Sequence, residues 1–300
     1  MKNLIVITFL TFLLTGCYDP ALQESTDTNI YKSKVDTTKP RQILNIAGST
    51  TMAPILKSVA AYFQSANNVT VNIKETGSIE GIKGIYSDSA DIAMASNQMP
   101  DSLINLFQKN KKEYAEFLLA GDALVFIVNI NNPIKKLTDA HLKGIFRGEI
   151  TNWKMLGGND ENIKLFSRDQ TSGTYSFFKE TILTDKSLPD GVDYFKDQKE
   201  ILKQVSKEKN AIGYISFSKL DYSIDPLDIS FDGGKTYIQP RIETVNNLKY
   251  KYYRGLYLYY KPEVYNKIKY FLEAVKSDTV QKIIRANGYI PLSNKLIANH

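Results

Sequence analysis

Three short loops rich in hydroxyl groups and glycine constrain the fold of this chain more than any other feature. They lie at Ser49–Thr51, Gly77–Gly81 and Arg168–Thr174, and each follows an apolar run and precedes residues with helical spacing. Repeated strand–loop–helix units are typical of α/β proteins with a parallel sheet. In such a sheet the loops gather at the carboxyl ends of the strands, where these proteins bind ligands. We therefore predict an α/β fold whose ligand site is formed by the three loops.

The composition of the loops indicates the kind of ligand. Free backbone N–H groups and the positive end of the helix dipole attract an anion to the start of a helix. Arg168 is able to bind two oxygen atoms at once, and Gly173 allows a close approach of the backbone. Together the loops would hold a tetrahedral oxyanion without a metal ion. For one loop taken alone, an N-capped helix beside a surface arginine is the simpler interpretation.

The rest of the chain alternates between strand and helix candidates. The strand 43–47, a helix beginning at Pro54 and the strand 69–73 are spaced as a βαβ unit. A helix is expected at 103–107, with a continuation through 111–116. Further strands are expected at 91–95, 122–129, 163–166 and 211–217, a hairpin at 227–232 and 236–239, and helices around 138–146, 175–183, 201–205, 264–275 and 280–284.

Residues 250–261 interleave tyrosines with lysine and arginine. Such a pattern is able to bind single-stranded nucleic acid, because bases stack on aromatic rings. A half-buried strand with its tyrosines packed on one side explains the same pattern. We favour the strand, since the net charge of +6 is diffuse and the chain lacks the Lys/Arg blocks of a nucleic-acid arm. We therefore predict no nucleic-acid partner.

The first residues have the pattern of a bacterial lipoprotein signal. Lys2 precedes the apolar run Leu4–Leu14, which is too short to span a bilayer but has the length of a signal-peptide core. The following Leu-Thr-Gly-Cys resembles a lipobox, in which the cysteine, here Cys17, is lipidated and becomes the mature N-terminus. We expect a signal peptide at 1–17, a lipid anchor that holds the protein at a membrane facing the periplasm or the exterior, and a disordered tether at 18–41.

The composition gives little support for an enzyme or a metalloprotein. The chain has one cysteine and two histidines, His141 and His300. A single cysteine excludes an intramolecular disulfide and a Cys-based metal site, and two histidines leave little scope for a Ser-His-Asp triad. No segment pairs a nucleophile with a base. We predict no cofactor, no metal and no enzymatic activity. A metal-free enzyme acting on phosphate esters, and a binding protein for another oxyanion such as sulfate, are the alternatives.

Several longer motifs resemble those of the phosphate-binding lipoproteins that serve bacterial phosphate ABC transporters, a group within the type II periplasmic binding proteins. The resemblance covers about residues 43–293. It rests on Gly-Ser-Thr-Thr-Met-Ala-Pro (48–54), Thr-Gly-Ser-x-x-Gly-Ile-Lys (76–83), Ala-Asp-Ile-Ala-Met-Ala-Ser (90–96), Ile-Phe-Arg-Gly-Glu-Ile-Thr-Asn-Trp (145–153), Arg-x-x-x-Ser-Gly-Thr (168–174), Ala-Ile-Gly-Tyr-Ile (211–215), Gln-Lys-Ile-Ile (281–284) and Gly-Tyr-Ile-Pro-Leu (288–292).

This resemblance implies two α/β lobes joined by two crossing strands, which close on the ligand by a hinge movement. Lobe 1 would comprise residues 43–127 plus 250–300, and lobe 2 residues 128–249. The protein would be a monomer that captures inorganic phosphate and delivers it to the permease subunits of an ABC transporter. Phosphate would contact Ser49, Thr50, Thr51, Ser78, Arg168, Ser172, Gly173 and Thr174.

Asn97 departs from the pattern of the resemblance. Many members of that group have an aspartate here, which accepts the proton that phosphate still carries at neutral pH. We include Asn97 among the phosphate-binding residues and expect its neutral amide to reject sulfate less strongly than a carboxylate does. Asn97→Asp is therefore expected to raise the preference for phosphate over sulfate. Alternatively, Asn97 caps the following segment and points away from the ligand.

Overall fold

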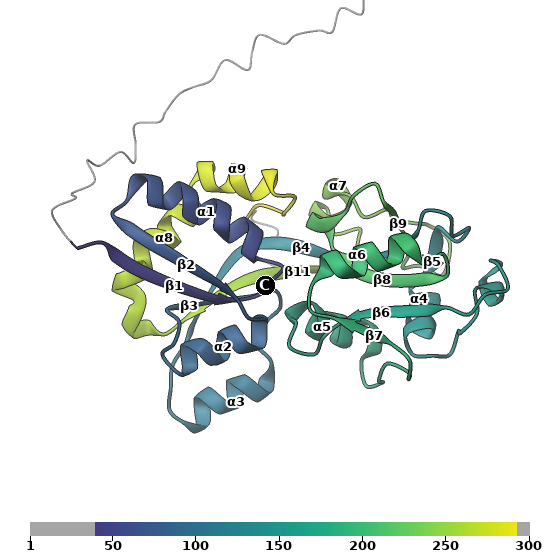
Figure 1. Cartoon of the computed structure of the whole chain (residues 1–300), viewed down its shortest axis with the longest axis horizontal. Helices are drawn as coiled ribbons and strands as arrows, with labels where there is room; N and C mark the ends of the chain where they lie inside the picture. Colours follow the sequence, from purple (N-terminus) through teal and green to yellow (C-terminus); the bar gives the residue numbers. More distant parts are fainter. Residues whose placement is uncertain (1–39, 293–300) are drawn as a thin grey trace, which may run out of the picture.

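The structure, a computed structural model, describes residues 40–292 and consists of two α/β lobes joined by two long strands (Figure 1). These strands are β4 (Ala115–Asn129) and β11 (Tyr253–Tyr260), which pair in antiparallel fashion. The main sheet has the strand order β2 (Val69–Glu75), β1 (Gln42–Gly48), β3 (Ile92–Ala95), β11, β4, β8 (Ala211–Ser216), β6 (Lys164–Arg168) and β7 (Asp193–Phe195), and β9 (Ile224–Pro226) also pairs with β4. The predicted α/β fold with two lobes and two crossing strands is confirmed.

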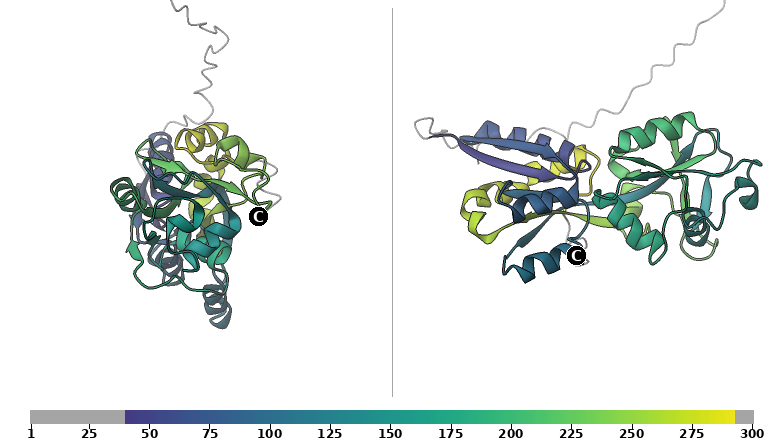
Figure 2. Two further views of the ribbon diagram at one scale, coloured as in Figure 1. Left: turned by 90° about the vertical axis from the view of Figure 1, so that its right-hand side faces the viewer. Right: turned by 60° about the horizontal axis from the view of Figure 1, so that its bottom comes forward.

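Lobe 1 is built on the predicted βαβ unit. Strand β1 (Gln42–Gly48) pairs in parallel with β2 (Val69–Glu75) and with β3 (Ile92–Ala95). The views in Figures 1 and 2 show helices on both faces of this part of the sheet. One face is covered by α1 (Ala53–Ala66), α8 (Tyr265–Lys276) and α9 (Asp278–Ala286), and the other by α2 (Ser78–Tyr86) and α3 (Asp101–Lys109).

Helix α1 shows how the sequence determines this packing. Pro54 stands in the first turn, where a missing N–H group costs nothing because that group has no partner within the helix. Ile55, Leu56 and Val59 recur on one side of the helix and are fully buried in the core of lobe 1. Full burial of such a side chain stabilises the fold by about 1.5–3 kcal/mol. The helix therefore holds its N-terminus firmly at the edge of lobe 1 that faces lobe 2.

Lobe 2 repeats the arrangement around β6, which lies between β8 and β7 and is parallel to both. Thr138 caps α4 as predicted, because its side chain accepts a hydrogen bond from the His141 N–H. The elements are β5 (Lys136–Thr138), α4 (Asp139–Phe146), β6 (Lys164–Arg168), α5 (Gly173–Phe178) with its π-helical continuation η2 (Lys179–Leu183), β7 (Asp193–Phe195), α6 (Gln198–Lys207), β8 (Ala211–Ser216), β9 (Ile224–Pro226), β10 (Asp228–Ser230) and α7 (Ile242–Asn246), with short 3-10 turns at Trp153–Leu156, Phe217–Lys219 and, in lobe 1, Pro262–Val264.

Two local predictions were wrong. Residues 111–116 do not continue the helix, because α3 ends at Lys109 and Lys111 takes a left-handed conformation with φ of 51°. The chain instead enters β4 at Ala115, which is longer than expected because it pairs with the whole of β11. The hairpin is reduced to a single bridge between Ile229 and Ile238, since β10 pairs in parallel with β5.

The tyrosine-rich segment is the predicted strand, β11, but it is more deeply buried than expected. All residues from Arg254 to Tyr260 are buried. Tyr257 and Tyr259 pack in lobe 1 against the helices α2 and α3. Stacked bases need exposed rings, so this strand offers no platform for nucleic acid.

The predicted signal peptide, Cys17 and nearly all of the tether lie outside the described residues. Among residues 40–292, no helix has the length and apolar character that crossing a bilayer requires.

Candidate functional site

The three predicted loops meet where the lobes face each other. In lobe 1, Gly48 ends β1 with φ of 139° and its carbonyl accepts hydrogen bonds from the N–H groups of Thr76 and Gly77. The Ser49 N–H donates to the Met94 carbonyl of β3 at 2.8 Å. The first two loops are therefore fixed side by side at the carboxyl ends of β1, β2 and β3, and α1 and α2, on opposite faces of the sheet, both begin at this edge.

The third loop reaches these two from lobe 2. The Ser78 Oγ accepts a hydrogen bond from the Gly173 N–H at 3.2 Å and another from the Ser96 N–H at 3.2 Å. The Oγ1 atoms of Thr51 and Thr174 lie 3.1 Å apart. A Cβ atom on Gly173 would lie only 2.4 Å from the Ser78 Oγ, so the two lobes come this close because residue 173 is glycine.

Arg168 is the fixed positive charge of this site. It ends β6 and is only 2% exposed. Its Nε donates to the Phe195 carbonyl at 3.1 Å, and its Nη2 donates to the Lys196 carbonyl at 2.7 Å and to the Thr50 Oγ1 of lobe 1 at 3.2 Å. The Nη1 atom is buried without a hydrogen-bond partner among the described residues.

A buried N–H group without a partner is costly, by roughly 1–3 kcal/mol or more for a charged group. Burial lowers the pKa of Arg168 below its usual value, and the carboxylate of Asp169, 3.9 Å away, opposes that shift. An arginine nevertheless keeps its charge in a folded protein. The Nη1 group of Arg168 therefore has two N–H donors left for an acceptor such as an anion oxygen.

Two of the predicted hydroxyl groups bind backbone N–H groups nearby in the chain, Ser172 as the N-cap of α5 and Ser49 in the turn before α1. The Ser172 Oγ accepts from the Thr174 N–H at 3.2 Å, and the Ser49 Oγ accepts from the Met52 N–H at 3.4 Å. Both side chains are almost fully buried. For these two residues, a local hydrogen bond accounts for the side-chain hydroxyl, whereas the hydroxyls of Thr50, Thr51, Ser78 and Thr174 make contacts between the lobes.

Asn97 lies just after β3 and makes its side-chain contact across the lobes. Its Nδ2 lies 3.0 and 3.1 Å from the two carboxylate oxygens of Glu180, which belongs to η2 of lobe 2. Asn97 is 7% exposed. The side chain therefore contributes to the contact between the lobes, and Glu180 is a member of the site that the loop motifs did not reveal.

Sequence patterns also missed a buried polar network behind the loops. Gln198 at the start of α6 donates from its Nε2 to the Thr51 Oγ1 at 2.6 Å, and its Oε1 accepts from the Ser216 N–H at 2.5 Å. The Ser216 Oγ donates to Asp122 of β4 at 2.7 Å. No local pattern marks these residues, because each finds its partner on a strand or loop far away in the sequence.

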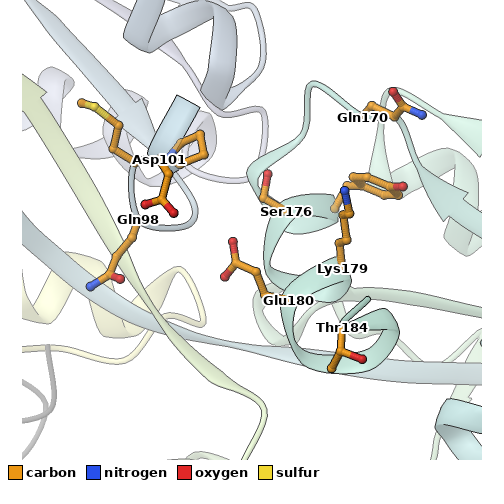
Figure 3. A pocket seen from close by; sticks show the side chains of 10 residues that line it. Gln98, Asp101, Gln170, Ser176, Lys179, Glu180 and Thr184 are labelled. Atoms are coloured by element: carbon orange, nitrogen blue, oxygen red, sulfur yellow. The ribbon is translucent and has the colours of Figure 1, made fainter. Parts of the chain in front are cut away.

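A groove of about 630 Å³ lies between the lobes, and Gln170 of the third loop is among its lining residues (Figure 3). None of the predicted anion-binding residues lines it. Its lining residues are Gln98, Met99, Pro100 and Asp101 of lobe 1 and Gln170, Tyr175, Ser176, Lys179, Glu180 and Thr184 of lobe 2. The anion loops themselves are closed on each other. Within the described part of the chain, no cluster of three or more His, Cys, Asp or Glu side chains is arranged to hold a metal ion.

Two lobes that enclose buried donors between helix N-termini define a two-lobed ligand-binding protein of the periplasmic type. Residues 32–279 match the PBP superfamily domain. The chain is 31% identical over 259 residues to the phosphate-binding protein PstS of Borreliella burgdorferi, covering 83% of this chain and 90% of that relative. It is 28% identical over 260 residues to PstS of Bacillus subtilis, covering 84% and 81%.

A solved structure with bound ligand is similar as well. It is that of a putative phosphate ABC transporter substrate-binding protein with bound phosphate from Clostridium perfringens, with a TM-score of 0.76 and 31% identity over 84% of this chain and 100% of that one. The chain belongs to the PBP superfamily and, within it, to the family of PstS-type phosphate-binding proteins.

Proposed function

We propose that this protein captures inorganic phosphate between its lobes and delivers it to the permease of an ABC transporter. The names of its relatives, and the phosphate bound in the similar structure from Clostridium perfringens, support this function. The observation that carries the proposal is the buried Nη1 atom of Arg168, which has no partner among the described residues. An oxyanion oxygen would supply the missing acceptor.

The surroundings of Arg168 suit a small tetrahedral anion. The hydroxyls of Thr51, Ser78 and Thr174 surround the contact between the loops, and each of these side chains is at most 2% exposed. The helices α1, α2 and α5 all begin here, and η2 continues α5. Helix N-termini and a guanidinium that the fold holds in place favour an anion at this point. We propose Ser49, Thr50, Thr51, Ser78, Asn97, Arg168, Ser172, Gly173 and Thr174 as the residues of the phosphate site.

Binding without turnover is the activity that these residues support. Of the two histidines, His141 is exposed on α4, outside the site. The hydroxyls between the lobes have amide, hydroxyl or guanidinium partners rather than a general base. Incubation with a chromogenic phosphate ester tests this point, and release of the chromophore would contradict it.

The attachment to a membrane and the division into lobes are further parts of the proposal. The lipobox at Leu14–Cys17 supports a lipid anchor at Cys17 that holds the protein on the outer side of a bacterial membrane. The tether 18–41 would let the lobes reach the permease. We propose that residues 43–127 plus 250–300 and residues 128–249 move as two bodies in a monomer.

Calorimetric titration of the purified chain with phosphate and with sulfate tests the function. We expect saturable binding of phosphate at a ratio of one per chain and much weaker binding of sulfate. Equal or tighter binding of sulfate would support the alternative of a protein for another oxyanion. Absence of binding for both anions would contradict the proposal.

A further inference from the structure

The contact between Asn97 and Glu180 joins the two lobes beside the anion loops. Asn97 follows Ser96, whose N–H donates to the Ser78 Oγ at the meeting point of the loops. Figure 3 shows Glu180 projecting from lobe 2 toward Gln98 and Asp101, which precede and begin α3 of lobe 1. The Nδ2 atom of Asn97 lies within 3.1 Å of both carboxylate oxygens of Glu180.

This contact determines the orientation of the Asn97 amide. An amide has one end that donates and one end that accepts, whereas a carboxylate only accepts hydrogen bonds. Glu180 therefore selects the NH₂ end of Asn97, and the opposite orientation would bring the Oδ1 against two carboxylate oxygens. Because Glu180 binds the NH₂ end, the part of the Asn97 amide that is available to a ligand is the acceptor Oδ1.

We propose that Glu180 is a specificity-determining residue that acts by positioning Asn97, so that the closed site presents an acceptor and no donor at this point. This inference rests on the proposed function. An acceptor favours an anion that still carries a proton, as monohydrogen phosphate does, over sulfate, which has none. Glu180 itself repels both dianions, so its charge alone does not distinguish them. The discrimination comes from the fixed amide.

Substitution of Glu180 tests the proposal in the full-length chain purified in detergent. In Glu180→Ala the amide is free to turn its NH₂ end toward sulfate. We expect the ratio of the sulfate and phosphate dissociation constants to fall by about tenfold, the effect of one hydrogen bond gained by the wrong anion. In Glu180→Gln either end of the new side chain is able to face Asn97, so the ratio should fall in the same direction but less. This second variant keeps the test valid if the first does not fold.

Two further variants separate positioning from other effects. Glu273→Ala removes an exposed carboxylate of α8, far from the loops in sequence and outside the groove, and should leave the ratio unchanged. In the Asn97→Ala background, Glu180→Ala should not change the ratio further, because the amide that Glu180 positions is already absent.

The possible outcomes distinguish this inference from the proposed function. If Glu180→Ala weakens the binding of both anions by the same factor, Glu180 only holds the lobes together and the inference is wrong. The same conclusion follows if the wild type binds phosphate and the ratio does not change in any Glu180 variant. If the wild type binds neither anion, the proposed function is wrong, and this inference, which rests on it, is wrong as well.

Discussion

Arg254 and Asp122 form a buried ion pair where the two inter-lobe strands run side by side. The two residues are directly opposite each other in the pairing of β11 with β4, and Nη2 and Nε of Arg254 lie 2.8 and 3.1 Å from the Asp122 Oδ2. Neither side chain is more than 1% exposed. The other oxygen of Asp122 accepts from Ser216, which is linked through Gln198 to Thr51. A continuous series of hydrogen bonds therefore connects the strands between the lobes to the anion loops.

Removal of one partner of this pair should destabilise the fold more than removal of both charges. Arg254→Met leaves a buried, uncompensated carboxylate, which costs about 3–5 kcal/mol. Adding Asp122→Asn removes that charge, so the double variant should recover part of the lost free energy of unfolding. Urea denaturation measures the free energy of unfolding of the single and the double variant. Lys57→Met, which breaks an exposed pair with Glu75, is the control and should cost at most about 1 kcal/mol. A double variant less stable than Arg254→Met would contradict the prediction.

Arg168→Lys should weaken phosphate binding although the positive charge is kept. Lysine has no planar fork of donors and does not reproduce the contacts of Nε and Nη2 while also reaching an anion. We expect the dissociation constant for phosphate to rise by at least about tenfold, the loss of one charge-assisted hydrogen bond. Arg285→Lys, on the exposed side of α9, is the matched control. If calorimetry gives the same dissociation constant for Arg168→Lys and the wild type, Arg168 does not bind the phosphate.

Gly173→Ala should prevent the lobes from closing. The added methyl group would lie 2.4 Å from the Ser78 Oγ and 2.8 Å from the Ser96 Oγ, both of which belong to lobe 1. We expect weaker binding of phosphate, and small-angle scattering should show that saturating phosphate lowers the radius of gyration of the wild type but not of the variant. Gly84→Ala, where the new methyl group has only ordinary contacts, should behave as the wild type. If phosphate lowers the radius of gyration of Gly173→Ala as much as that of the wild type, closure of the lobes does not require glycine at residue 173.

The sequence predicts the parts of the site that depend on neighbouring residues. A strand, a loop with hydroxyls and glycine, and a helix follow each other within about a dozen residues, so the positions of Ser49–Thr51, Gly77–Gly81 and Arg168–Thr174 in the fold were predictable. Gln198 and Glu180 were not, because their partners Thr51 and Asn97 are 147 and 83 residues away in the chain. Tertiary contacts also decided the length of β4, where pairing with β11 overrides the local helical pattern of residues 111–116.

Cys17→Ser should abolish lipid attachment. Only a thiol accepts the diacylglyceryl group of a bacterial lipoprotein, so the variant should accumulate as an unlipidated precursor. Metabolic labelling with a radioactive fatty acid, followed by detection of the protein, measures the modification. Since Cys17 is the only cysteine of the chain, labelled lipid on the variant would show that the lipobox interpretation is wrong.

Asn97→Asp should have a different effect from the one that the sequence alone predicts. The resemblance to the phosphate-binding family led to the expectation that an aspartate would raise the preference for phosphate, but that expectation did not include Glu180. In the closed structure the new carboxylate would lie about 3 Å from the carboxylate of Glu180. Two carboxylates this close do not both ionise without a large cost. Closure of the variant should therefore be opposed at neutral pH, and phosphate should bind more weakly than to the wild type.

The pH dependence and a second substitution test this explanation. The closed form of Asn97→Asp binds a proton that the open form does not need, so a fall in pH should favour closure. The loss of phosphate affinity relative to the wild type at the same pH should therefore become smaller. Asn97→Asp combined with Glu180→Gln exchanges the two groups between the lobes. This double variant has no repulsion and presents a carboxylate in lobe 1, so it should recover phosphate affinity and have a higher phosphate-to-sulfate ratio than the wild type. Paired titrations with both anions at two pH values measure these quantities. Wild-type affinity in Asn97→Asp at neutral pH would mean that Glu180 does not approach residue 97 in solution, and an unchanged ratio in the double variant would mean that residue 97 does not face the anion.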